Sequence, residues 1–214
     1  MSSAIELLDK RSLSRVFDEK VPDYLTPSEA TAIINAARMQ NRRDELFLKL
    51  LWMTGVRVSE ATAITPNDIK EGSLRVYGKA KPTLKEKRGK KGKPKNGKRE
   101  RYIPLPDSLR ADLYSYIVDS RIAPTERIFP FTTTRAYQVV KQYAQLAGAE
   151  QNREAGIHPH LFRHGFAVNF LKQTHNLVAL KELLGHTSIL RTMIYLRLAQ
   201  VDLREAMDQV NFFV

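Results

Sequence analysis

The chain is 214 residues long and carries 35 Lys and Arg against 23 Asp and Glu, a formal net charge of +12 at pH 7. It contains no cysteine, which excludes disulfides, thiolate catalysis and cysteine-based zinc sites and fits the reducing cytoplasm. No run of about 18 apolar residues is present, so we expect no membrane-spanning helix and no secretory signal. The basic balance favours a polyanionic partner such as nucleic acid, although a ribosomal or merely basic protein has the same balance.

The first part of the chain reads as an arm followed by helices. Residues 1–24 show only a short amphipathic stretch and are expected to form an N-terminal arm. The sequence TPSE at 26–29 predicts a helix start, because threonine caps, proline suits the first helical position and glutamate completes a capping box. An apolar-rich helix is expected over 43–54 and should end at Gly55, which can adopt positive φ. A short helix over 58–63 and a further turn at Thr65-Pro66 follow.

In the middle of the chain the pattern of apolar residues becomes typical of β-strands. SLRVY at 73–77 and RYIPL at 101–105 are expected to form two strands, and RIFPF at 127–131 a third, edge strand, since its proline cannot donate to a ladder. No internal repeat is present. The fold class is therefore mainly α with a small antiparallel β-sheet (α+β). The remaining helices are expected at 107–119, 133–147, 161–173, 176–184, 188–198 and 202–210.

One segment supplies nearly all of the excess charge. Residues 79–101 hold twelve Lys or Arg and two Glu, a net of +10, which leaves a net of +2 for the rest of the chain. The segment is rich in Gly and Pro and has no apolar periodicity, so we expect a mobile loop or hairpin tip. Its alternative is a solvated, disordered run of charge. The residues predicted to bind DNA are Lys81, Lys85, Lys87, Arg88, Lys90, Lys91, Lys98 and Arg99.

Four scattered motifs carry groups that could do chemistry. They are TGVRVSE around Arg57, HPHLFRHGFA around His160 and Arg163, LLGHTS around His186, and RTMIYLRLA around Tyr195. Each has an ordinary interpretation: a surface arginine, a helix-capping histidine, a leucine-rich helix ended by glycine, and a core tyrosine.

Together these motifs resemble the tyrosine recombinase and integrase family, over about residues 24–200. The family signature is an arginine in TG-x-R-x-S-E, then H-x-x-R, then L-G-H, and a tyrosine nine residues later, as Tyr195 follows His186. The spacing from Arg163 to His186 suits Xer-like members. The resemblance implies the tyrosine recombinase catalytic domain fold over 25–214. It also implies a site-specific DNA recombinase or integrase that cleaves and rejoins DNA through a 3′-phosphotyrosyl intermediate.

The resemblance assigns Tyr195 as the nucleophile and Arg57 and Arg163 as the phosphate clamp. Cleaving a phosphodiester builds negative charge on the non-bridging oxygens, which two planar guanidinium forks can bind. A tyrosine hydroxyl has a pKa near 10 and therefore needs a proton acceptor and a positive site. Glu60 lies three residues after Arg57, on the same helix face, and is expected to orient it. In LFRH, Phe162 is expected to face the core.

The resemblance also implies the proton-transfer groups. His160 is the expected general base, and His186 is expected to hydrogen-bond the phosphate. Lys79, in VYGKAK, is the expected general acid for the departing 5′ oxygen. The hairpin is lengthened by about 15 residues and is rich in lysine, so Lys81 and Lys98 stay open as alternatives.

No cofactor or metal is expected. His158, His160 and His164 lie close together, but a zinc site wants three or four ligands in tetrahedral geometry and no cysteine is present to help. No G-x-x-x-x-G-K-[ST] loop for ATP is present, and the phosphotyrosine bond conserves the energy of the broken phosphodiester. Relatives carry an N-terminal DNA-clamping domain, which we do not expect in the short segment before residue 25.

Two other functions stay open. A type IB topoisomerase-like enzyme uses similar residues to nick and reseal DNA. A non-enzymatic regulator would use residues 177–196 as a helix-turn-helix, but would leave Arg57 and the H-x-x-R motif unexplained. The expected partners are double-stranded DNA and three further copies of the chain on that DNA, with the free protein mainly monomeric. Residues 202–214, a C-terminal helix and tail, are expected to dock on a neighbouring subunit or to fold back in cis.

Overall fold

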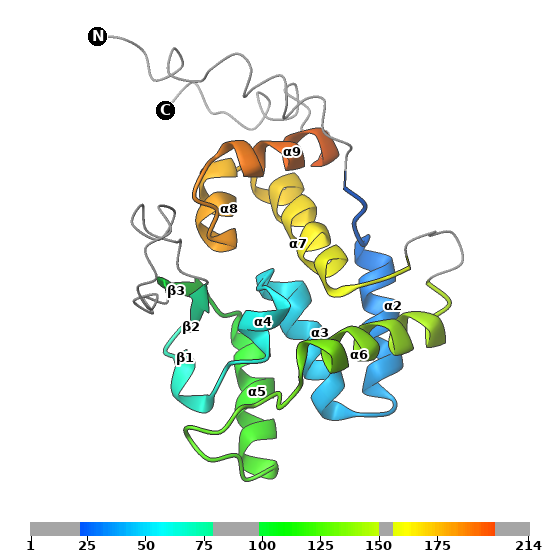
Figure 1. The fold of residues 1–214 in the computed structure, drawn as a ribbon, viewed down its shortest axis with the longest axis vertical. Coiled ribbons are helices and arrows are strands. Elements are labelled where there is room, and N and C mark those ends of the chain that lie inside the picture. Colours follow the sequence, from blue (N-terminus) through cyan, green and yellow to red (C-terminus); the bar gives the residue numbers. More distant parts are fainter. Residues whose placement is uncertain (1–21, 79–98, 150–155, 200–214) are drawn as a thin grey trace, which may run out of the picture.

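The computed structural model describes residues 22–78, 99–149 and 156–199. Figure 1 shows two groups of elements: a larger lower body of helices with a small sheet at its side, and an upper group of three helices. The described elements, in chain order, are α2 (Pro27–Arg38), α3 (Arg42–Thr54), α4 (Val58–Ala61), the 3-10 turn η1 (Pro66–Asp68), β1 (Ile69–Lys70), β2 (Ser73–Gly78), β3 (Arg99–Pro104), α5 (Asp107–Asp119), α6 (Thr133–Leu146), α7 (Pro159–Thr174), α8 (Leu177–Leu184) and α9 (Leu190–Ala199).

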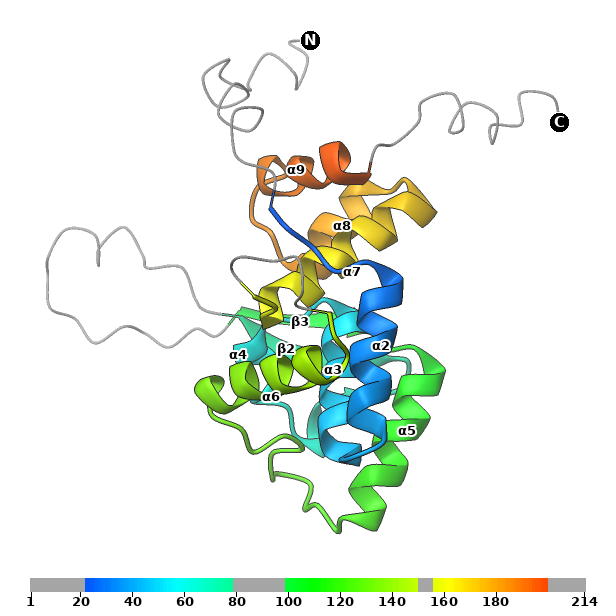
Figure 2. The ribbon, with the colours of Figure 1, turned by 90° about the vertical axis from the view of Figure 1, so that its right-hand side faces the viewer.

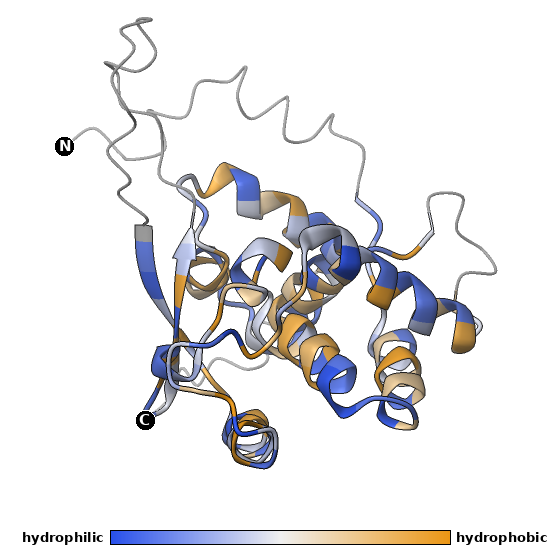
Figure 3. Ribbon diagram, turned by 60° about the horizontal axis from the view of Figure 1, so that its bottom comes forward, coloured by the Kyte–Doolittle hydropathy of each residue, from blue (hydrophilic) through white to orange (hydrophobic). Residues whose placement is uncertain are grey.

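The lower body forms around α3, which packs against α2, α5 and α7. The predicted start of α2 and the predicted end of α3 are both confirmed. The Thr26 side chain accepts from the Glu29 backbone N–H, and the Glu29 carboxylate accepts from the Thr26 backbone N–H, which completes the capping box. Gly55 ends α3 with a φ of 61°. Figure 3 shows hydrophobic and hydrophilic residues together along most helices, so that each helix can bury one side and leave the other to solvent.

The sheet is antiparallel with the strand order β1-β2-β3. Strands β2 and β3 pair from Ser73 opposite Pro104 to Gly78 opposite Arg99. The mainly helical fold with a small antiparallel sheet, and the two longer strands, are therefore as the sequence predicts. The third strand is different: it is the short β1, which precedes β2 and pairs with it.

The expected edge strand at 127–131 is wrong. This segment has no ladder partner: the Ile128 N–H donates to Ile64 O at 3.0 Å, and the Phe131 N–H folds back onto Phe129 O at 2.7 Å across the proline. Phe129 and Phe131 instead pack edge-on against Phe47 of α3, with ring centroids 5.5 and 5.1 Å apart. The apolar residues of RIFPF thus pack on a helix and do not form a strand.

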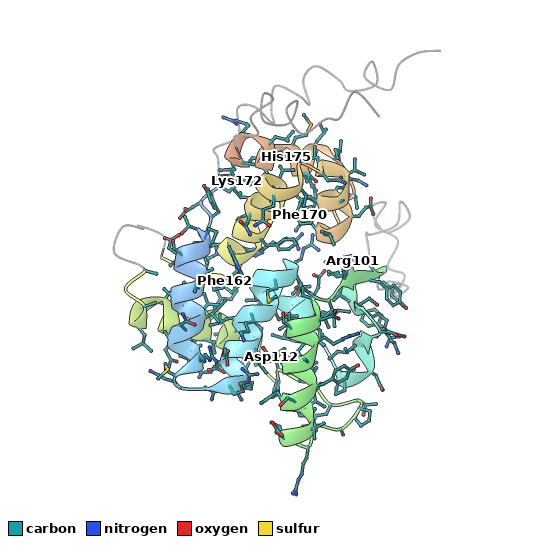
Figure 4. All side chains as sticks on the ribbon, turned by 180° about the vertical axis from the view of Figure 1, so that it is seen from behind. Arg101, Asp112, Phe162, Phe170, Lys172 and His175 are labelled. Carbon is teal, nitrogen blue, oxygen red and sulfur yellow. The ribbon has the colours of Figure 1, made fainter. Side chains whose placement is uncertain are left out.

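The upper group consists of α7, α8 and α9, which have their own small core. Figures 1 and 2 show α7 running from the lower body towards α8 and α9. At its lower end Phe162, labelled in Figure 4, is fully buried in the main core, as expected. Because α7 belongs to both groups, it fixes where the residues of the upper helices lie relative to α3 and the sheet.

Every other helix prediction that falls on described residues agrees with the structure to within about two residues, and two of the shifts matter for the site. The helix expected over 58–63 ends at Ala61, and α7 begins at Pro159, so that His160 lies inside the helix and His158 takes the N-cap position. Several predictions lie outside the described residues: most of the arm 1–24, the stretch from Lys79 to Lys98, and the helix and tail at 202–214.

Candidate active site

The first component of the site is Arg57 with its partner Glu60. Arg57 is the N-cap residue of α4, directly after the turn at Gly55 that ends α3. The Glu60 carboxylate accepts from the Arg57 backbone N–H at 2.8 Å and from Arg57 Nη1 at 3.1 Å. The Arg57 side chain keeps 36% of its surface exposed, and only Nη1 is engaged among the described contacts. Its Nε and Nη2 have no partner among the described residues and remain available to a ligand.

A second arginine, Arg101, holds the other side of Glu60. Its Nη1 and Nη2 donate to the two carboxylate oxygens at 2.7 and 2.9 Å, a bidentate pair. Glu60 is only 2% exposed. Burial alone would raise the pKa of this carboxyl, but the hydrogen bonds and charge of Arg101, with those of Arg57, hold its pKa below the usual value. Glu60 is therefore ionised at neutral pH.

The sequence did not identify Arg101 as a site residue: it was predicted only as the last charge of the basic segment and the first residue of a strand. The strand period offered a signal, because Arg101 shares its face of the strand with Ile103 and Leu105, both buried. Arg101 also lies against Gly185: a Cβ added there would be 3.1 Å from Arg101 Cζ. Figure 4 shows Arg101 between the sheet and the upper helices.

Arg163 joins three of the four motifs. It is 4% exposed and lies in α7. Its Nη1 donates to Gly55 O at 2.6 Å, beside Arg57, and its Nη2 donates to Leu184 O at 2.7 Å and lies 3.3 Å from His186 Nε2. Burial, and next the charge of Arg57, lower the pKa of Arg163 to about 10, so the guanidinium stays protonated at neutral pH.

The geometry around His186 determines its tautomer. Gly185 ends α8 with a φ of 63°, which turns His186 back towards Arg163. An arginine can only donate, so His186 Nε2 must accept, and Nδ1 then carries the proton and donates to Thr192 Oγ1 at 3.1 Å. Burial, and next the charge of Arg163, lower the pKa of His186 to about 3, which keeps the ring neutral. Thr192 is fully buried, so the ring is held from both sides.

Tyr195 lies in α9 and is 3% exposed. Its hydroxyl is 2.8 Å from Nδ1 of His164, the residue directly after Arg163. Burial raises the pKa of this tyrosine, and the positive charges of Arg163 and Arg57 oppose that rise. The hydroxyl is therefore protonated at neutral pH, close to both arginines.

His160 does not contact Tyr195 among the described residues. It is exposed at the start of α7, with its ring 6.1 Å from that of His158. Burial, followed by the positive neighbours His158, Arg163 and Arg57, lowers its pKa. The hydroxyl of Tyr195 pairs with His164 and not with His160. From the sequence, His164 is considered only as a possible metal ligand.

The structure thus brings Arg57, Glu60, Arg163, His186 and Tyr195 together, with His160 at the exposed margin. Lys79 lies outside the described residues but directly follows Gly78, the last residue of β2. For Arg99 only the strand position is described, opposite Gly78, and the other predicted DNA-binding residues lie outside the described ranges.

The described residues include neither a candidate metal site nor a helix that could span a membrane. No group of three His, Cys, Asp or Glu side chains in the ranges above is placed to hold a metal ion. None of the described helices has the length and apolar character needed to cross a membrane.

Comparison with known proteins gives consistent matches. A "Tyrosine recombinase" of Pseudothermotoga lettingae is 30% identical over 90% of this chain and 61% of its own length. "Tyrosine recombinase XerA" of Pyrococcus furiosus is 31% identical over 89% of this chain and 63% of its own length. The chain therefore spans less than two thirds of these relatives.

Solved structures share the fold at lower identity. A crystal structure of XerA recombinase superposes with a TM-score of 0.65 at 22% identity, over 91% of this chain and 66% of that one. The catalytic domain of bacteriophage HP1 integrase gives 0.61 at 23% identity, over 87% of this chain and 94% of that one. The pattern of the phage integrase family matches residues 23–201, most of the chain. The chain belongs to the phage integrase family.

Proposed function

We propose that this chain is the catalytic part of a tyrosine-type site-specific DNA recombinase. The observation that carries the proposal is the set of contacts made by Arg163. Its guanidinium bonds the carbonyl of Gly55, two residues before Arg57, and also Leu184 and His186 of the L-G-H motif. Motifs more than 100 residues apart in sequence thereby converge within reach of one tyrosine hydroxyl.

The arginines suit a phosphodiester. Arg163 Nε and one N–H of Nη1 have no partner among the described residues, and Arg57 offers Nε and Nη2. These donors can bind the non-bridging oxygens, where charge increases in the transition state. Since carbonyls and Glu60 hold both guanidinium groups before DNA arrives, little reorganisation is needed.

The reaction that we propose has two balanced steps. The Tyr195 oxygen attacks phosphorus and loses its proton, and the bond from phosphorus to the 5′ oxygen breaks, which leaves a 3′-phosphotyrosyl bond and a 5′ hydroxyl. A 5′ hydroxyl from another strand then attacks the phosphotyrosine and releases Tyr195. The protein supplies charge and proton transfer, and no cofactor is required.

Residue roles follow from the resemblance and from these contacts. Tyr195 is the nucleophile, and Arg57 and Arg163 clamp the phosphate. The resemblance makes His186 a phosphate contact. In this structure its Nε2 accepts from Arg163 and its Nδ1 donates to Thr192, so His186 has to exchange one of these bonds in order to donate to the phosphate. Glu60 orients Arg57. Lys79 is the candidate acid for the 5′ oxygen, because it follows the strand that pairs with the one carrying Arg101. The resemblance makes His160 the expected base, and the structure offers His164 as a second candidate.

The partner that we propose is double-stranded DNA in the cytoplasm, bound by four copies of the chain. The net charge of +10 in residues 79–101 provides cations for phosphate contacts. A relative in this fold, XerH site-specific recombinase, was solved bound to a palindromic difH substrate in a post-cleavage complex. Recombination joins two duplexes with four cuts, so four active sites are needed.

Covalent capture tests the proposal. The protein is incubated with a pool of nicked duplexes of randomised sequence, in which cleavage beside the nick releases a short fragment and traps the adduct. Wild-type protein should yield covalent adducts, Tyr195→Phe none, and Tyr114→Phe, at an exposed tyrosine of α5, as many as wild type. Adducts that form with Tyr195→Phe would contradict the proposed nucleophile.

The captured sequence then identifies the reaction. Two labelled duplexes carrying it should exchange strands if the chain is a recombinase. Relaxation of supercoils without exchange would indicate a nicking-closing enzyme. Binding without any adduct would indicate a regulator.

A further inference from the structure

The contact between Tyr195 and His164 is not explained by the roles assigned so far. The hydroxyl lies 2.8 Å from His164 Nδ1, across the packed pair α7 and α9, and the two rings have centroids 5.8 Å apart. Tyr195 is 3% exposed, and the hydroxyl has no other hydrogen bond among the described residues. The atom that would attack phosphorus is thus already paired with one nitrogen.

The direction of this hydrogen bond follows from the charge state of the two groups. Burial, and next the charges of His160, Arg163 and His158 in their protonated forms, lower the pKa of His164 to about 4, so its imidazole is neutral at neutral pH. Burial raises the pKa of Tyr195, which keeps its hydroxyl protonated. The phenol therefore donates to Nδ1 of a ring whose Nε2 carries the proton, the arrangement required for transfer from oxygen to nitrogen.

We infer that His164 is the proton acceptor for Tyr195 in the cleavage reaction, an inference that rests on the proposed function. As the phenol oxygen forms its bond to phosphorus, its proton moves to Nδ1 and the ring becomes an imidazolium. The bond from phosphorus to the 5′ oxygen breaks, and that oxygen takes a proton from a separate acid. In the rejoining step the imidazolium returns its proton to the departing Tyr195 oxygen.

The charges around His164 imply that its affinity for a proton increases when DNA is bound. The groups that face His164 are His158, His160 and Arg163 on and beside its own helix, Asp23 in the segment before α2, and Tyr195 on α9. All but Asp23 and Tyr195 disfavour a proton on His164. A phosphate bound by Arg57 and Arg163 adds negative charge near this set, which favours the imidazolium. His164 therefore becomes a better base when substrate is in place.

His160 provides the sharpest comparison, because it is the same residue type on the same helix, four residues away. Its side chain is exposed, and it makes no hydrogen bond to Tyr195 in the described structure. The charges of Arg163 and Arg57 act on it, so it lies near the two arginines proposed to bind the phosphate.

The experiment removes basicity while retaining the hydrogen-bond acceptor. In His164→Asn the amide oxygen can take the place of Nδ1 but cannot accept a proton. Adduct formation is followed in single turnover on a nicked duplex of the captured sequence, with the full chain. His164→Asn should slow the reaction by about 100-fold or more. His175→Asn, at the C-cap of the same helix with a φ of 52°, should react within about twofold of wild type, since asparagine tolerates this conformation.

A more acidic nucleophile separates proton transfer from positioning. Tyr195 is replaced by 3,5-difluorotyrosine, which loses its proton more easily and needs less help from a base. In the His164→Asn protein this substitution should recover about tenfold or more of the rate. In the His160→Asn protein, 3,5-difluorotyrosine should not recover the cleavage rate to a comparable extent, whatever the rate of that variant with tyrosine.

Each remaining outcome is decisive. If His164→Asn reacts at the wild-type rate, or is slow without recovery by difluorotyrosine, His164 is not the acceptor. Recovery confined to His160→Asn would assign the role to His160. If wild-type protein forms no adduct, the proposed function fails and the inference with it. Should the Asn variant not fold, His164→Gln replaces it, and nitrogen NMR of the free wild-type protein should show an unprotonated Nδ1 at His164; a protonated Nδ1 would overturn the inference.

Discussion

Replacing Arg101 should destabilise the protein in a way that depends on pH. Arg101→Met keeps the methylene stem but removes both hydrogen bonds to Glu60, at 2.7 and 2.9 Å. Glu60 is 2% exposed and would keep only its contacts with Arg57. Removing one partner of a buried ion pair costs about 3–5 kcal/mol, because the other charge is left buried. We therefore expect a loss of about 3–5 kcal/mol in the free energy of unfolding at pH 7.

The sign of the pH dependence follows from the pKa of Glu60. In the wild type this pKa lies below its unfolded value, so the ion pair contributes stability above that unfolded value, and the contribution is lost as the pH falls through the folded pKa. In Arg101→Met burial dominates and raises the pKa of Glu60, so the carboxyl becomes neutral in mildly acidic solution. The deficit should therefore be small near pH 4 and should grow towards pH 7.

Urea unfolding followed by circular dichroism between pH 4 and pH 8 measures this deficit. Glu60→Gln in the Arg101→Met background should restore part of the stability at pH 7, since it removes the unpaired charge. Arg110→Met is the matched control, because its partner Asp107 is 86% exposed, and it should cost less than about 1 kcal/mol. A deficit that does not change with pH, or additive effects of the two substitutions, would refute the reasoning.

Four further predictions follow. Arg163→Lys should slow single-turnover cleavage by about 2–4 kcal/mol of activation free energy, because lysine cannot make the fork; a near-normal rate would contradict the clamp. Gly55→Ala should lower the free energy of unfolding by about 2–4 kcal/mol, since its Cβ would lie 2.3 Å from Phe166 Cδ1 at a φ of +61°; an unchanged urea midpoint would contradict this. Deleting residues 83–97 should flatten the dependence of log K for DNA on log salt, and an unchanged slope would make the charge irrelevant to binding. Removing residues 201–214 should weaken assembly on a two-site DNA in sedimentation more than it weakens single-site binding; normal assembly would contradict docking in trans.

Local signals predicted the features that depend on near neighbours. The capping box at Thr26 and the turn at Gly55 follow from conformational preferences of a few adjacent residues. The prediction of a strand at 127–131 failed because a short apolar run does not specify what it packs against, and Phe129 and Phe131 pack against a helix. Strand pairing is a non-local property, and no strand of the described ranges pairs with this segment.

The motif residues of the site could be identified from sequence, but two of their partners could not. Arg101 acquires its role from the register of β2 with β3, which places it opposite Val76 and above Glu60, 41 residues earlier in the chain. His164 acquires its role from the packing of α7 on α9, across 31 residues. In both cases the residue type is common, and only the tertiary contact distinguishes it.

The most direct test of the account is to identify the bond between protein and DNA. Covalent adducts captured on nicked duplex are digested with protease and nuclease and analysed by mass spectrometry. The account predicts a single modified peptide, which contains Tyr195 linked to a 3′ phosphate, and a DNA product that ends in a 5′ hydroxyl. A nucleotide attached to any other residue, or a 5′-phosphate linkage, would contradict it.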